Sequence, residues 1–486
     1  MQLRLLVPCL SLALLSACTT VGPDYKVPEE AAVQRDDLQG PLLHDEPELS
    51  SAPIPADWWQ LYHDPLLNQL VAQAMRANTD LRIASANLAR ARAQVGNAQA
   101  QGGFQGSASA GAQRLQESGE AFLLTDKVPV ANIGVAEVKV SYQFDLWGTL
   151  ERGIEAAQAN AEAQQAAADV ARITVVADVA QAYAQVCAAN EERHIAERSL
   201  QLQQQSSDLT QKLRDAGRSN ETEVTRADAQ TKLLRAQLPR FNAAQQAGLF
   251  RLSMLLAQPL DQLPTGVTDC TSLPNLQQQL PVGDGAALLR RRPDIRQAER
   301  QLAAATAQIG VATGQLYPDI SIGATAGSIG LLENLGEPST NRWGFGPLLS
   351  WTFPSNGARA RISMAEASTQ AALARFDGVV LNAMRETQTA LAEYTAALDS
   401  RDAMQATEQA ASSAAQQTRQ LYQAGRASFL EDLQATRTYT DVRAQLAQAN
   451  TEVTLRQIQL FLALGGGWEQ TDNAPAAALP SQQAQP

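Results

Sequence analysis

The chain has 486 residues and a formal net charge of −12, with 38 Lys and Arg against 50 Asp and Glu. This acidic balance argues against a nucleic-acid surface, which needs clustered positive charge. Aromatic residues make up only 5% of the chain. Ala and Gln are abundant, and both are good helix formers, so a mainly helical protein is the first expectation.

The first residues have the pattern of a bacterial lipoprotein signal. Arg4 precedes an apolar run over 5–15, which is too short to span a bilayer and is typical of a signal peptide. The Leu-Ser-Ala-Cys sequence that ends at Cys18 resembles the lipobox, whose cysteine becomes the acylated first residue of the mature protein. Ordinary cleavage after a small residue is the alternative. Neither of the next two residues is Asp, which favours the outer membrane over the inner one.

The cysteines and histidines offer little chemistry. Cys187 and Cys270 remain in an oxidising compartment, where they could pair or stay free. We expect them to be free, because Cys187 is predicted in mid-helix and Cys270 in a distant loop. The three histidines are scattered without metal-ligand spacing, and no nucleotide, hydrolase or metalloprotease motif is present. The sequence therefore predicts neither an enzyme nor a metal site nor a cofactor.

The chain contains an internal duplication at an offset of roughly 210 residues. Three pairs of segments match in the same order: 80–96 with 294–310, 141–148 with 350–357, and 216–227 with 424–435. Chance similarity between Ala- and Gln-rich helices is the alternative, but it does not explain the matching ends of predicted strands.

Each copy has two candidate β-strands. The clearest spans 135–145, where apolar and polar residues alternate strictly, and 343–353 repeats the pattern with aromatic residues near both ends. Weaker partners span 104–113 and 319–327. A soluble sandwich is one interpretation, and a membrane strand of about 9–11 residues is the other. Four membrane strands cannot close a barrel, because the smallest have about eight, so several chains would have to share one.

Two long segments, 148–216 and 357–424, contain no proline and hardly any glycine. Each would form a helix of roughly 100 Å. Small residues recur at coiled-coil spacing, which permits close helix packing. A purely structural, lipid-anchored coiled coil is an alternative, but it leaves the strands unexplained.

Together these features resemble the outer-membrane efflux proteins, the TolC/OprM/NodT-like family, and its lipidated branch in particular. Three segments carry the likeness: 18–28, which begins Cys-Thr-Thr-Val-Gly-Pro-Asp-Tyr; 58–81, which begins Trp-Trp; and 288–299, which begins Leu-Leu-Arg-Arg-Arg-Pro-Asp-Ile. The likeness covers the mature chain to about Trp468.

The resemblance implies a mainly α protein with membrane β structure. In the TolC-like fold, four β-strands per protomer contribute to a trimeric, twelve-stranded β-barrel, which continues into a long periplasmic α-helical coiled-coil barrel with an equatorial domain. The implied division of this chain is 1–17 signal peptide, 18–76 lipidated N-terminus and equatorial segment, 77–258 first repeat with a strand pair at about 103–145, 259–293 equatorial linker, 294–464 second repeat with a strand pair at about 318–354, and 465–486 a partly disordered tail.

The resemblance also places a periplasmic gate at the two matching helix turns. Acids that ring the pore in relatives correspond to Glu431 and Gln434, and the second departs from the usual acid. Asp432 is adjacent but is expected to point elsewhere on the helix. The alternative for these residues is a solvated helix tip.

A tether between the two turns is the second part of this gate. Relatives hold the gate shut with a Tyr and an Arg that reach an acid on the first turn. Tyr422 matches the Tyr and Glu223 the acid, whereas the Arg position holds Ala427, with Arg426 beside it. We therefore expect a closed-state contact between Tyr422 and Glu223.

The implied function is a passive outer-membrane exit duct for drugs or other small toxic compounds. The partners would be a homotrimer of the chain, a periplasmic adaptor (membrane fusion) protein, an inner-membrane transporter of the resistance–nodulation–division (RND) class, and outer-membrane lipid. The alternative is a similar duct for another cargo, in protein secretion or in metal or aromatic-acid export. The chain would be lipid-anchored in the outer membrane and extend into the periplasm.

Overall fold

The structure is a computed structural model that describes residues 20–40, 49–123, 125–276 and 278–466. Cys18, the predicted lipidation site, lies outside these residues. The chain divides into two compact units, one formed by 1–31, 87–165 and 297–377, and the other by 32–86, 166–296 and 378–486. Among the described residues, no helix contains a stretch both long and apolar enough to cross a bilayer.

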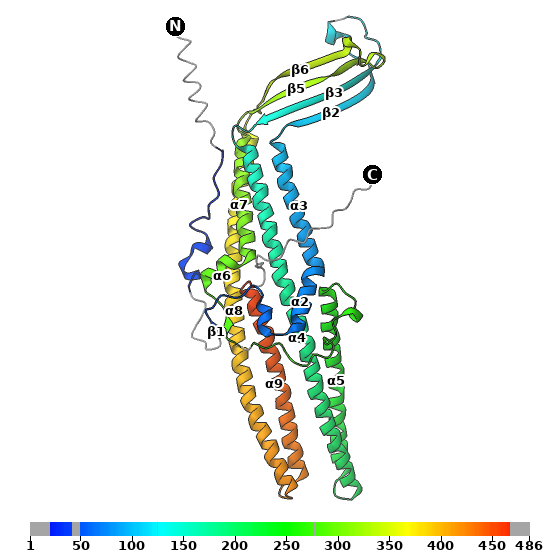
Figure 1. The fold of residues 1–486 in the computed structure, drawn as a ribbon, viewed down its shortest axis with the longest axis vertical. Coiled ribbons are helices and arrows are strands. Elements are labelled where there is room, and N and C mark those ends of the chain that lie inside the picture. The colour runs from blue at the N-terminus through cyan, green and yellow to red at the C-terminus, as the bar shows by residue number, and fades with distance from the viewer. Residues whose placement is uncertain (1–19, 41–48, 124, 277, 467–486) are drawn as a thin grey trace. The chain divides into compact units, whose positions relative to one another are not determined.

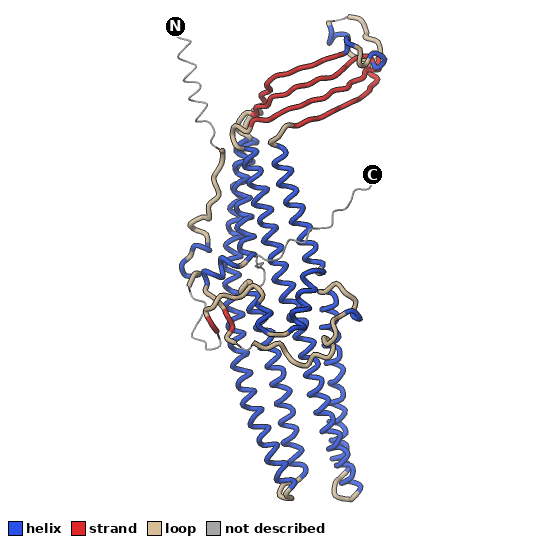
Figure 2. The backbone as a smooth tube through the Cα atoms, in the orientation of Figure 1, coloured by secondary structure: helices blue, strands red, loops and turns tan. Residues whose placement is uncertain are grey.

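The first unit contains a four-stranded sheet (Figures 1 and 2). Its strands are β2 (Gln105–Leu115), β3 (Ala131–Phe144), β5 (Asp319–Leu331) and β6 (Asn341–Ser350). They pair in the order β2-β3-β5-β6, and every pair is antiparallel. The prediction of two strands in each copy is confirmed, although β3 begins four residues earlier than the alternation alone indicated.

One face of this sheet is apolar and exposed. Directly opposed residues of antiparallel strands share a face, and one such row joins Ala108, Val138, Ala326 and Trp343. Trp343 is 83% exposed in the chain. The adjacent row is displaced by one residue, so it lies on the opposite face of the sheet. This row is polar, and its Glu137 and Arg342 form an ion pair. The alternation predicted for 135–145 and 343–353 is therefore confirmed at these two rows.

The N-terminal segment of the first unit is fixed to the helices by Arg152. This arginine is buried, and it donates hydrogen bonds to the carbonyl oxygen of Val21 at 3.0 Å and to the carboxylate of Asp24 at 2.6 Å. Gly22 packs against the backbone of Gly310. A side chain at position 310 would in turn collide with the side chain of Arg152. The segment that follows Cys18 in sequence is thus held in one place on the first unit.

Four helices contribute residues to both units: α3 (Thr79–Gln101), α4 (Thr149–Asp215), α7 (Pro293–Gly314) and α8 (Asn356–Gln423). Helices α4 and α8 have 67 and 68 residues, which confirms the two predicted long helices. Each is followed by a 35-residue helix, α5 (Glu221–Leu255) or α9 (Phe429–Ala463). The matching lengths agree with the duplication in the sequence.

The second unit also contains short elements, namely β1 (Leu49–Ser50), α2 (Pro65–Ala77), β4 (Leu280–Pro281) and α6 (Gly285–Arg291). Strands β1 and β4 pair in parallel. Fully buried Trp58 stacks on Phe461 of α9 with ring centroids 4.6 Å apart. This packing joins the N-terminal part of the unit to the end of the last helix.

The expectation that the cysteines are free is wrong, because Cys187 and Cys270 form a disulfide. The loop after α5 returns to α4, where the Asn190 side chain donates hydrogen bonds to the carbonyl oxygens of Thr268 and Cys270 at 2.9 and 2.8 Å. Residues 83 positions apart in sequence are thereby adjacent in space. Sequence spacing could not indicate this return of the loop.

Candidate functional site

The two helix tips of the second unit are built by the same backbone motif. Two residues after the end of each helix stands a glycine in the left-handed region, Gly217 after α4 with φ of +68° and Gly425 after α8 with φ of +69°. The next residue in each tip, Arg218 or Arg426, donates its backbone N–H to the carbonyl oxygen five residues earlier at 2.8 Å. These are helix ends in which a left-handed glycine satisfies the last carbonyl groups. The Ala-Gly-Arg repeat in the sequence encodes this turn twice.

The helices that follow the two turns begin with different caps. Asn220 accepts a hydrogen bond from the backbone N–H of Glu223 at 3.0 Å. In the second tip, the Ser428 hydroxyl accepts from the N–H of Glu431, and the Glu431 carboxylate accepts from the N–H of Ser428 at 2.6 Å. This reciprocal pair is a capping box, which satisfies two otherwise unpaired donors at a helix start.

Capping holds the Glu431 side chain close to its own helix start. The hydrogen bonds from the Ser428 backbone and side chain lower the pKa of Glu431 below its ordinary value, so the carboxylate is ionised at neutral pH. Gln434 is exposed one turn further along. Asp432, by contrast, is only 5% exposed, so it does point away from this exposed face.

Within the described chain, the predicted tether residues have separate partners. The Glu223 carboxylate accepts a hydrogen bond from the Ser219 hydroxyl, and the Tyr422 ring packs edge-on against Phe429 with centroids 5.8 Å apart. No hydrogen bond joins Tyr422 to Glu223 among the residues that the structure describes. Arg426 is exposed, and the described residues form no ion pair with it.

A different link connects the two helix pairs, and sequence reasoning missed it. Gln203 of α4 is almost fully buried. Its amide nitrogen donates to the carbonyl oxygen of Ala227 in α5 at 3.1 Å, and its amide oxygen accepts from Arg437 of α9. Burial lowers the pKa of Arg437 and raises that of Asp441 one turn away. One Gln among many in a helix gives no sequence signal for this contact.

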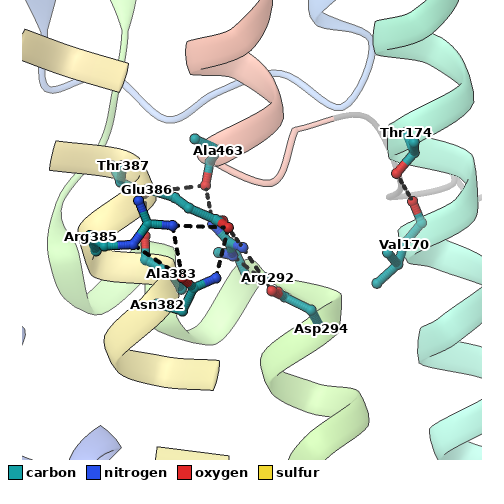
Figure 3. A network of polar contacts seen from close by, with 10 residues as sticks. All are labelled: Val170, Thr174, Arg292, Asp294, Asn382, Ala383, Arg385, Glu386, Thr387 and Ala463. Carbon is teal, nitrogen blue, oxygen red and sulfur yellow. Dashed lines mark hydrogen bonds and ion pairs between the residues drawn. The ribbon is translucent and has the colours of Figure 1, made fainter. Parts of the chain in front are cut away.

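A second polar centre lies where α6, α7, α8 and α9 meet (Figure 3). Arg292 is 7% exposed, and its guanidinium contacts Asp294 at 2.7 and 3.0 Å and Glu386 at 2.8 Å. It also donates to the carbonyl oxygen of Ala463, the last residue of α9, at 2.7 Å. A cation at a helix C-terminus compensates the partial negative charge of the carbonyl groups there.

The first copy contains the same junction with a neutral residue. Asn78 precedes α3 as Arg292 precedes α7, and its side chain donates to the carbonyl oxygen of Leu255, the last residue of α5, at 2.9 Å. In each repeat, therefore, the side chain of the residue before α3 or α7 contacts the last residue of α5 or α9, respectively. From the sequence, the arginine run 290–292 indicated only the family resemblance. It did not indicate that Arg292 contacts the end of α9.

A sheet with one exposed apolar face and long helix pairs that end in capped turns are the features expected of channel-forming outer-membrane proteins. A family model described as outer membrane efflux protein matches residues 70–258 and 286–466, so the chain belongs to this family. The protein is therefore an outer-membrane efflux channel that extends into the periplasm, and it is not an enzyme.

Individual proteins agree with this assignment. The solved outer-membrane channel OprN is 33% identical, with a TM-score of 0.82, and the match covers 93% of this chain and 100% of that one. Nodulation protein T of Rhizobium leguminosarum bv. viciae is 27% identical over 96% of this chain and 94% of its own length. The cation efflux system protein CusC of Escherichia coli O157:H7 is 28% identical over 96% and 99%.

Proposed function

We propose that three copies of the chain form one duct that conducts small toxic compounds passively to the exterior. The observation that carries this proposal is the sheet, in which β2 and β6 are edge strands and one face is apolar and exposed. In lipid, unpaired edge groups are too costly to persist, so the edges must pair with strands of other chains. Three chains supply twelve strands, enough for a closed barrel.

The helices of the second unit support the same assembly. Helix α5 has an exposed row with alternating three- and four-residue spacing: Leu233, Ala236, Arg240, Ala243, Ala247, Phe250 and Met254. Helix α8 has a similar row of mostly small residues: Ala392, Ala396, Asp399, Ala403, Ala406, Ala410 and Ser413. This spacing is that of a coiled-coil seam, and within one chain nothing covers it in the described residues. Neighbouring copies in a closed tube of helices would cover both rows.

The remaining parts of the assembly follow from the family. Acyl chains on Cys18 would anchor the duct, and the Arg152 contacts hold the segment after it on the first unit. A periplasmic adaptor and an inner-membrane RND-type transporter would deliver the cargo and supply the energy. The domain division predicted from sequence remains part of this proposal. Cation export is the alternative cargo, because CusC is a cation efflux protein by name.

The gate in this proposal lies at the helix tips. Three copies of ionised Glu431 around an axis would attract cations, with Gln434 as a neutral second level. Tyr422, Arg426 and Glu223 would meet across neighbouring tips in the closed duct. The buried Gln203–Arg437 contact would hold the two helix pairs of one chain together as they move.

The gate is tested by single-channel recording of the trimer in planar bilayers. Tyr422→Phe combined with Glu223→Ala should raise the conductance, whereas Asp228→Ala, which changes another exposed acid of α5, should leave it unchanged. Glu431→Gln should shift the reversal potential in a salt gradient towards lower cation preference. An unchanged conductance in the Tyr422 and Glu223 double variant would contradict the proposed contact between these residues. An unchanged reversal potential in Glu431→Gln would contradict the role of the three Glu431 carboxylates.

The function itself is tested by deleting the gene and measuring growth on a panel of drugs and metal salts. Sensitivity to several unrelated organic compounds, restored by the wild-type gene, is the expected result. Sensitivity to metal salts alone would favour the cation alternative. A deletion with normal tolerance to the whole panel, in a strain without a second such channel, would contradict the proposal.

A further inference from the structure

A cavity of about 460 Å³ lies between helices α4, α8 and α9 of the second unit. Its lining combines Ile195 and Leu202 of α4 with the hydroxyl groups of Thr436, Tyr439 and Thr440 of α9. The volume is in the range of small-molecule sites. Ile195 is buried, so the cavity has an apolar floor as well as polar walls.

The charged residues around this cavity are almost all basic. Arg198, Arg419 and Arg443 line it together with His194, whereas Glu191 is the single acid in the lining. This is unexpected in a chain with 12 more acidic than basic residues. Three helices contribute these groups, so they do not form a run in the sequence, and their grouping is a product of the fold.

The three arginines lack acidic partners among the described residues. Arg198 donates only to the side-chain oxygen of Gln201, at 2.7 Å. Neither Arg419 nor Arg443 forms an ion pair or a side-chain hydrogen bond with the part of the chain that is described. Like charges gathered in one cavity repel one another, and a bound anion would remove this repulsion.

We propose that this cavity is a binding site for an organic anion that carries two or more carboxylate groups on a small apolar body. Guanidinium groups bind carboxylates through paired hydrogen bonds, and three of them from three helices can hold separate carboxylates. The floor of Ile195 and Leu202 accepts the apolar body, and Tyr439 offers a further hydroxyl donor. Because the arginines come from both helix pairs, the bound anion would also link α4 to α8 and α9.

Isothermal titration calorimetry on the purified full-length trimer in detergent tests this site, with benzene-1,3,5-tricarboxylate as the probe. We expect one tricarboxylate per protomer and no heat from the neutral analogue benzene-1,3,5-trimethanol. Inorganic phosphate should bind more weakly, because it lacks the apolar body. Phosphate that binds as tightly as the tricarboxylate would contradict the role of the apolar floor.

The variants R419Q and R443Q, combined in one chain, should weaken tricarboxylate binding roughly 100-fold, since each removes a charged hydrogen-bond donor. The matched control is R226Q with R235Q, which removes two exposed arginines of α5 outside the cavity and should leave the affinity unchanged. Equal circular dichroism spectra establish that both variants are folded. Absence of tricarboxylate binding to the wild type, or an equal loss in both double variants, would overturn the proposal.

Discussion

Replacing Arg292 with methionine removes the charge that joins four helices and keeps most of the apolar stem. The buried guanidinium makes four contacts shorter than or equal to 3.0 Å, three to carboxylate oxygens and one to the carbonyl oxygen of Ala463. Methionine makes none of them. The last turn of α9 therefore loses its cation, and the Asp294 carboxylate loses its ion pair. The Glu386 carboxylate keeps the amide of Asn382 at 2.7 Å and the guanidinium of Arg385 at 3.8 Å.

The size of the effect follows from the exposure of the partners. Removing one member of a buried ion pair costs about 3–5 kcal/mol. The side chains of Asp294 and Glu386 are 31% and 38% exposed, so water partly replaces the lost contacts. Among the described residues, the carbonyl oxygen of Ala463 keeps only the hydroxyl of Thr387, at 3.2 Å, and that hydroxyl also contacts the carbonyl oxygen of Ala383 at 2.9 Å. We expect a net loss of about 2 kcal/mol, which is roughly a 30-fold change in a local equilibrium.

Hydrogen exchange of the amides in the last turn of α9 measures this change directly, because local opening sets their exchange rate. In R292M these amides should exchange roughly 30-fold faster than in the wild type. Arg385→Met is the control, since Arg385 lies beside the centre with a side chain that is 64% exposed, and it should change the rate less than about threefold. Wild-type rates in R292M, or equal acceleration in R385M, would refute this reasoning.

Three further predictions concern other parts of the chain. Gly310→Ala would place a methyl group 2.6 Å from the Arg152 side chain, so limited proteolysis should cleave the N-terminal segment faster than in the wild type. Gly96 is the equivalent residue of the first repeat and has open space around it, so Gly96→Ala should leave the cleavage rate unchanged. Hydrogen bonds from Ser428 lower the pKa of Glu431, so its capping contribution is present above the ordinary carboxylate pKa and is lost only as pH falls through the lowered value. Exchange protection at the start of α9, after correction for the intrinsic pH dependence of amide exchange, should therefore stay constant from pH 7 to pH 5. A loss of protection already within that range would contradict this role. Cys270→Ser removes a cross-link over 83 residues, worth up to about 4.5 kcal/mol. The variant should lower the melting temperature as much as reductant lowers that of the wild type, and reductant should have no further effect on the variant.

Much of the fold follows from local patterns in the sequence. Strict alternation in β3 predicts a sheet with one apolar face, and proline-free segments predict α4 and α8 to within one residue at each end. The Ala-Gly-Arg repeat predicts two equivalent turns, because each needs a left-handed glycine before the next helix. These features depend only on neighbouring residues, so the sequence is sufficient to identify them.

Long-range contacts could not be predicted in this way. The disulfide depends on the return of the loop after α5, and the Gln203–Arg437 contact depends on how α4 and α9 pack. Arg292 and Asn78 occupy equivalent places in the duplication, but their different partners are visible only in space. The residues predicted for the gate lie on the tips as expected, although Tyr422 and Glu223 have other partners within one chain.

Current through the purified full-length trimer in a planar bilayer tests the central claim most directly. A passive duct should give discrete conductance steps that depend on salt concentration and need no nucleotide or other energy source. Native mass spectrometry of the same sample should give three times the mass of one acylated chain. A trimer that inserts into the bilayer and carries no current above the lipid baseline, under either polarity, would contradict the account.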